Sequence, residues 1–186
     1  MVLLAALGAV GVAQAADSAG APAAHWVERK LDFTYMGFTT KYSCDGLEGS
    51  VRELLLTLGA RKKDLQIQSV GCSRLEGVEH FPGVSAKFWV LVPVSEDEAA
   101  KSGDTVVQAT QWQTVNLVGN GDFRIQQGQC ELLEQMKRQA LPLFTSRNLD
   151  FHSSCVPHEV TLGDIRFTVD VLRAVPAAAP AAAPAA

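Results

Sequence analysis

Thiols and imidazoles are the side chains of this sequence whose spacing could support chemistry. The four cysteines are Cys44, Cys72, Cys130 and Cys155. Cys44 and Cys130 each stand at the start of a segment with helical periodicity, where the helix dipole favours a thiolate. A thiol-redox activity is therefore one interpretation. The chain has no Cys-x-x-Cys pair, so a structural role for the cysteines is the other.

Metal binding is the second chemistry to consider. The segment "HSSCVPH" places His152, Cys155 and His158 three residues apart, which on one helix face could ligate zinc or copper. On a strand this spacing alternates between faces, and Pro157 favours a turn. We therefore predict no metal site and no cofactor. Metal handling or thiol redox, through this segment or the helix-start cysteines, remains the alternative function.

Patterns typical of enzymes or nucleic-acid binding are missing. No Gly-x-Ser-x-Gly turn joins a strand to a helix, and the Gly-x-Gly at Gly119 lacks the third glycine of a dinucleotide-binding loop. The chain carries a net charge of −4, and its basic cluster at 61–63 is short, so we predict no nucleic-acid partner. A binding or accessory protein without its own chemistry is the favoured interpretation.

Two helices and about six strands must position these residues. The first helix, 46–58, is predicted to be capped by Asp45 with Glu48 and to end at Gly59, with strands at 31–42, 64–69 and 85–94 around it. The second helix is ended or kinked by Pro142, with strands at 106–118, 148–153 and 164–172. The apolar stripes of the two helices are Leu47, Val51, Leu54, Leu55 and Leu58, and Leu132, Leu133, Met136, Ala140 and Leu143.

This order predicts a tandem βαββ repeat, with units at about 31–94 and 105–174 in a single domain, 31–174. Amphipathic helices over mostly antiparallel strands imply an α+β, two-layer sandwich. Both helices should lie on one face of a six-stranded sheet.

Geometry predicts the cysteine pairing. A helix of this length rises about 20 Å, and the following strand returns about 23 Å, so each strand ends beside the start of its helix. We therefore pair Cys44 with Cys72 and Cys130 with Cys155, at similar separations of 72 − 44 = 28 and 155 − 130 = 25. Because the two return strands differ by one residue, we also predict a β-bulge near Gly71.

The ends of the chain indicate export. Residues 1–15 are an apolar run that ends in a small-x-small pattern, as a signal peptide does. Residues 16–30 are predicted to be a mature N-terminal tail, and 175–186 an Ala/Pro-rich tail. No run reaches the roughly 20 apolar residues of a membrane span, so we predict a periplasmic or secreted protein.

Two stretches carry a resemblance to a known group of proteins. "YSCDGLEGSVRELLLTLGAR", at 42–61, and "CELLEQMKRQALPLF", at 130–144, resemble uncharacterised secreted proteins of Gram-negative bacteria. The resemblance implies a periplasmic location and nothing about chemistry.

The strand "KFWVLVPV" suggests where a partner would bind. Its two faces are both apolar, so Trp89 and Leu91, with Trp112 from a neighbouring strand, are predicted to lie on the face that the helices leave open. Such a face would bind an envelope protein or a second copy of the chain. The alternative is that the segment around Trp26, or the linker after Val94, covers this face and completes a small second core.

Overall fold

The computed structural model describes residues 20–38, 40–72, 77–94, 106–118, 129–156 and 165–175. The predicted signal peptide and most of the Ala/Pro-rich tail lie outside these residues. Among the described residues, no helix has the length and hydropathy to cross a membrane. The main elements are β1 (Ala24–Thr34), α1 (Cys44–Leu58), β2 (Gln66–Val70), β3 (Gly83–Pro93), β4 (Thr110–Asn116), α3 (Cys130–Gln139), β5 (Ser146–Ser153) and β6 (Ile165–Ala174).

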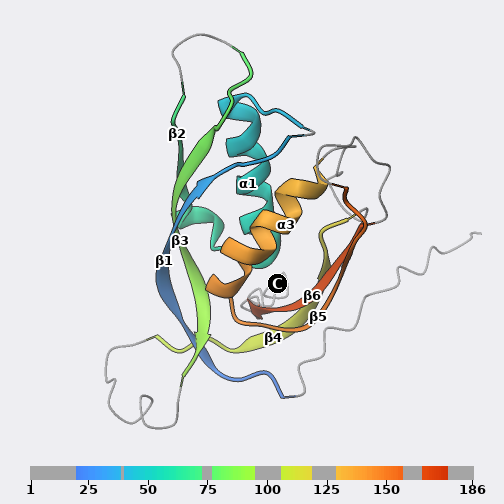
Figure 1. Ribbon diagram of the computed structural model, residues 1–186. Coiled ribbons are helices and arrows are strands. Elements are labelled where there is room, and N and C mark those ends of the chain that lie inside the picture. Colours follow the sequence, from blue (N-terminus) through green and yellow to red (C-terminus); the bar gives the residue numbers. More distant parts are fainter. Residues whose placement is uncertain are drawn as a thin grey trace, which may run out of the picture.

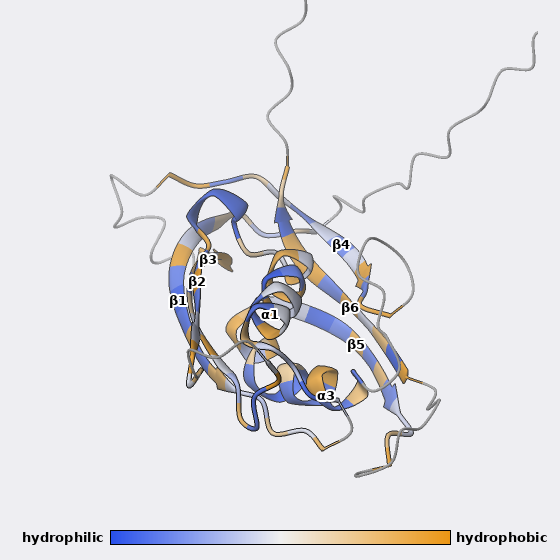
Figure 2. Cartoon of the chain, turned by 90° about the horizontal axis from the view of Figure 1, so that it is seen from above, coloured by the Kyte–Doolittle hydropathy of each residue, from blue (hydrophilic) through white to orange (hydrophobic). Residues whose placement is uncertain are grey.

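The strands form two antiparallel sheets, in the orders β1-β3-β2 and β4-β6-β5. The predicted α+β class is confirmed, but the single six-stranded sheet is wrong. The sheets approach each other at the isolated bridge between Ala24 and Gln108, and both helices lie between them (Figures 1 and 2). This arrangement lets the helices cover one face of each sheet. The two halves of the chain share one strand order, while their origin as a repeat stays a prediction.

Helix α1 follows its predicted pattern except at its first turn. All five predicted stripe residues are buried, and Gly59 ends the helix in the left-handed conformation, with φ of 113°, as a C-terminal cap requires. The N-terminal cap is Ser43, whose hydroxyl accepts a hydrogen bond from Gly46 N at 3.1 Å. Asp45 was the predicted cap, and the helix begins one residue before it.

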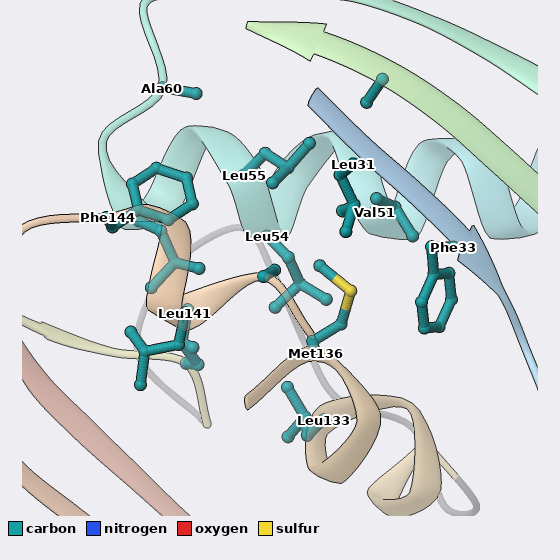
Figure 3. Close-up of a cluster of buried hydrophobic side chains, with 14 of the residues drawn as sticks. Leu31, Phe33, Val51, Leu54, Leu55, Ala60, Leu133, Met136, Leu141 and Phe144 are labelled. Carbon is teal, nitrogen blue, oxygen red and sulfur yellow. The ribbon is translucent and has the colours of Figure 1, made fainter. Parts of the chain in front are cut away.

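Helix α3 gives way to a 3₁₀ turn, Leu141–Leu143, that contains Pro142, as predicted. The turn places Phe144 against Phe88 of the first sheet, with ring centroids 5.5 Å apart. Figure 3 shows side chains of β1, α1, α3 and this turn meeting in the buried cluster. One core therefore joins both helices and both sheets.

Some strand boundaries differ from prediction. β1 begins at Ala24, inside the segment predicted to be a tail, because it pairs with β3 along its whole length, from Ala24–Pro93 to Thr34–Gly83. β4 is shorter than predicted. Before it, Gln108 forms only an isolated bridge.

The predicted disulfides are confirmed, and the predicted bulge is wrong. Cys44 pairs with Cys72 and Cys130 with Cys155, at Cα–Cα distances of 6.2 and 6.0 Å. β2 pairs regularly through Val70 and then ends. Gly71, with φ of 68°, turns the chain out of the strand toward Cys72. Cys72 and Cys155 both stand two residues beyond the end of their strands. The register irregularity lies instead in β5, whose pairing with β6 shifts between Arg147 and Asp150.

Candidate interaction surface

The predicted binding face is largely a second core. Leu91 is only 3% exposed and packs with Ala24 of β1 and Leu172 of β6, while Trp26 and Trp112 are partly buried against the same cluster. Leu91 and Trp112 therefore belong to the same cluster. The burial of Leu91 supports the alternative, in which the segment around Trp26 completes a small core where the two sheets meet.

Trp89 is engaged in a different contact. The Arg61 guanidinium lies 4.8 Å from the Trp26 ring and 5.1 Å from the Trp89 ring, so it contacts both aromatic side chains. Arg147 lies 4.3 Å from Trp112 in the same way. Such contacts hold an aromatic side chain in place at the edge of solvent. The three tryptophans are therefore already in contact with cations of this chain.

The histidine segment does not assemble as a metal site among the described residues. His152 is exposed on β5 opposite Arg166, and Cys155 is bonded to Cys130. His158 lies outside the described residues.

A surface that sequence reasoning missed lies at the other end of the first sheet. Five apolar residues, which we call the end patch, are exposed there: Met36 (64%), Phe38 (65%), Val70 (38%), Val78 (61%) and Phe81 (63%).

Backbone hydrogen bonds bring the segments of the end patch together near the start of α1 (Figure 1). Tyr35 N donates to Pro82 O at 2.9 Å, which sets Met36 and Phe81 on neighbouring segments, and Ser43 bridges Val78. The Cys44–Cys72 disulfide fixes the same region. The end patch is thus built on three tethered segments.

Helix α3 holds the backbone beneath Met36 and Phe38. The Gln135 side chain is buried, accepts from Met36 N at 3.0 Å and donates to Met36 O at 3.1 Å. The Glu131 carboxylate accepts from Phe38 N at 2.8 Å. The main chain at Met36 and Phe38 is therefore fixed while both side chains remain exposed, which is a preorganised arrangement for binding.

Two buried tyrosines complete this support. Tyr35 donates its hydroxyl to Glu131 at 3.2 Å and packs edge-on against Tyr42, with centroids 4.9 Å apart. Burial raises the pKa of Tyr42 to about 12. Burial, and next the Glu131 charge, raise the pKa of Tyr35 as well. Both phenols therefore stay neutral at physiological pH, and neither offers a reactive phenolate.

The sequence contained one signal for this surface. Apolar Met36 and Phe38 flank Gly37 in a stretch that reads as an interrupted strand, but its hydrogen-bond partners lie on α3, far along the chain.

Searches of protein-family models, curated proteins and solved structures found no match to this chain.

Proposed function

We propose that this is an exported, disulfide-stabilised binding or accessory protein of the cell envelope, which captures an apolar protein partner through the end patch. One observation carries the binding role: α3 fixes the backbones of Met36 and Phe38 while leaving both side chains more than 60% exposed. Exposed apolar clusters of this kind commonly mark interaction sites. Met and Phe are enriched in the buried centres of protein interfaces.

Export is supported by the two disulfides, because such bonds persist mainly in oxidising compartments. The apolar segment 1–15 and the resemblance to secreted Gram-negative proteins point the same way. A periplasmic or secreted location belongs to the same proposal.

The binding experiment compares two sets of substitutions. In the patch variant, Met36→Gln, Phe38→Ser and Phe81→Ser remove exposed apolar area. In the control variant, Val107→Thr and Leu149→Ser remove exposed apolar side chains that lie outside the end patch. These positions are 48% and 43% exposed. Each purified chain is immobilised on a resin and incubated with a periplasmic extract. Any captured protein is then purified, and its binding isotherm is measured with each variant.

We expect the wild type and the control to bind one protein with the same affinity, and the patch variant to bind it at least about tenfold more weakly. Loss of a few buried interface side chains commonly has an effect of this size or larger. Sedimentation of the wild type tests the alternative partner, a second copy. Equal binding by the patch variant, or no saturable partner, would rule out the end patch as the binding site.

A further inference from the structure

Both halves of the chain place the same four side chains around their disulfide. The helix begins at a cysteine, and a glutamate follows four residues later. This glutamate accepts a hydrogen bond from a serine on the return strand: Ser69 Oγ to Glu48 Oε2 at 3.0 Å, and Ser153 Oγ to Glu134 Oε1 at 2.7 Å. The second cysteine of the disulfide follows this strand.

The surroundings of the two glutamates differ. In the first half Arg52 donates to Glu48 Oε1 at 3.1 Å, so this carboxylate is already neutralised. In the second half the potential ligand atoms of Cys130, Glu134 and Cys155 all lie within 4.8 Å of one another, the one such group among the described residues. Only the second half therefore combines both sulfurs with a nearby carboxylate.

A single hydroxyl marks the point on which these three groups converge. Ser153 Oγ lies 2.8 Å from Cys155 Sγ, 3.5 Å from Cys130 Sγ and 2.7 Å from Glu134 Oε1. The three side chains are half-buried, so a small ion from solvent could reach this point.

We propose that reduction of the Cys130–Cys155 disulfide converts this cluster into a zinc site with Cys130, Glu134 and Cys155 as ligands. Two thiolates and a carboxylate suit Zn²⁺, and one position of its tetrahedral shell remains for water. The proposal does not depend on the end patch. It replaces the ligand set suggested by the histidine segment.

The chemistry requires an external dithiol reductant. Two thiol–disulfide exchanges transfer two electrons and two protons to the protein disulfide, giving two protein thiols and a cyclic disulfide of the reductant. Zn²⁺ then displaces the two thiol protons to solvent. Reoxidation by a disulfide-class oxidant removes both thiolates and releases the ion, so the site would report the local redox state.

The test uses the chain with Cys44→Ser and Cys72→Ser, in which only the second pair can be reduced. After reduction and removal of the dithiol, Co²⁺ is added as a spectroscopic probe and Zn²⁺ affinity is measured by competition with a chromogenic chelator. Glu134→Gln removes the proposed ligand, and Glu48→Gln is the matched control. Ser153→Ala removes a hydroxyl that is not a proposed ligand.

We expect one ion per reduced chain, a thiolate-to-cobalt charge-transfer band, and no binding to the oxidised chain. Even outer-shell substitutions weaken metal sites roughly 10–100-fold, so Glu134→Gln, which removes a ligand, should weaken zinc binding at least about tenfold, whereas Glu48→Gln should retain it. Ser153→Ala removes only a hydrogen bond to Glu134 and should weaken zinc binding less than Glu134→Gln does. Equal affinity in Glu134→Gln, or binding by the oxidised chain, would overturn the assignment.

Folding is followed by circular dichroism in the same samples. If the reduced chain unfolds and zinc does not restore it, the proposal is wrong. If the double serine variant does not fold even when oxidised, the titration is repeated on reduced wild type, with Cys130→Ser as the variant expected to lose the ion. Retained zinc affinity in that variant would equally overturn it.

Discussion

At the scale of single residues, the packing around Gly37 explains why this position, between Met36 and Phe38 of the end patch, has no side chain. A Cβ atom at this position would overlap the Tyr35 hydroxyl and lie 2.6 Å from Glu131 Oε2. The hydrogen bond between Tyr35 and Glu131 therefore passes directly against the Gly37 backbone. The sequence shows only that a glycine stands between the apolar residues Met36 and Phe38, and not the packing that requires it.

We expect Gly37→Ala to lower the free energy of unfolding by about 1–3 kcal/mol, the usual range for inserting atoms into a filled site. Gly49 is the matched control, since it lies on helix α1 with no heavy atom within 4 Å of an added Cβ. Gly49→Ala should raise stability by about 0.5–1 kcal/mol, because alanine is the better helix former. Urea denaturation measures both, and the same sign for the two variants would contradict this packing.

At the scale of elements, the end of helix α1 depends on a residue from the opposite half of the chain. Arg173 of β6 donates to Leu56 O at 3.1 Å and to Thr57 O at 2.5 Å. The last carbonyls of a helix lack partners within it and carry partial negative charge, so a guanidinium is well placed there. Burial lowers the pKa of Arg173, but a guanidinium remains charged at physiological pH.

Replacing Arg173 with Met should destabilise the fold by about 1–3 kcal/mol, because two carbonyls lose a charged donor. The control is Arg166→Ala on the same strand, which removes an exposed ion pair to Asp150 and should cost less than about 1 kcal/mol. Chemical denaturation compares the two variants. Equal small effects would show that water replaces Arg173 at the helix end.

Sequence periodicity predicted the two helices, the order of the strands and the pairing of the cysteines, although the bounds of several strands differ. The stripe from Leu47 to Leu58 reports directly which helix face is buried, and the lengths of helix and strand determine which cysteines meet. The division into two sheets was not predictable, because it depends on strand pairing between distant residues. The end patch was missed for a similar reason: Gln135, whose side chain holds the Met36 backbone, lies on another helix far along the chain.

At the scale of the whole molecule, the two halves are joined rather than merely adjacent. The main core contains buried residues from both helices and both sheets. Side chains also cross between the halves: Thr145 donates to Leu91 O at 2.8 Å, Tyr35 to Glu131, and Arg173 to the end of α1. Neither half can keep these groups buried and hydrogen-bonded without the other.

The chain should therefore unfold in a single cooperative transition. Its tryptophans can follow the unfolding of each half, because Trp26 and Trp89 lie in the first half and Trp112 lies in the second. Trp112→Phe leaves Trp26 and Trp89 as probes of the first half, whereas Trp26→Phe with Trp89→Phe leaves Trp112 in the second. Phenylalanine retains an aromatic face for Arg61 and Arg147, whose contacts hold these rings.

Fluorescence in each variant is compared with circular dichroism of the same variant during urea unfolding. We expect the two curves to coincide within each variant, as they do for a two-state domain, because disrupting either half exposes the shared core. The disulfides stay intact throughout, so each half keeps its local closure and could in principle unfold alone. Separate midpoints for fluorescence and circular dichroism would mean that each half is stable independently and that the contacts between them contribute little.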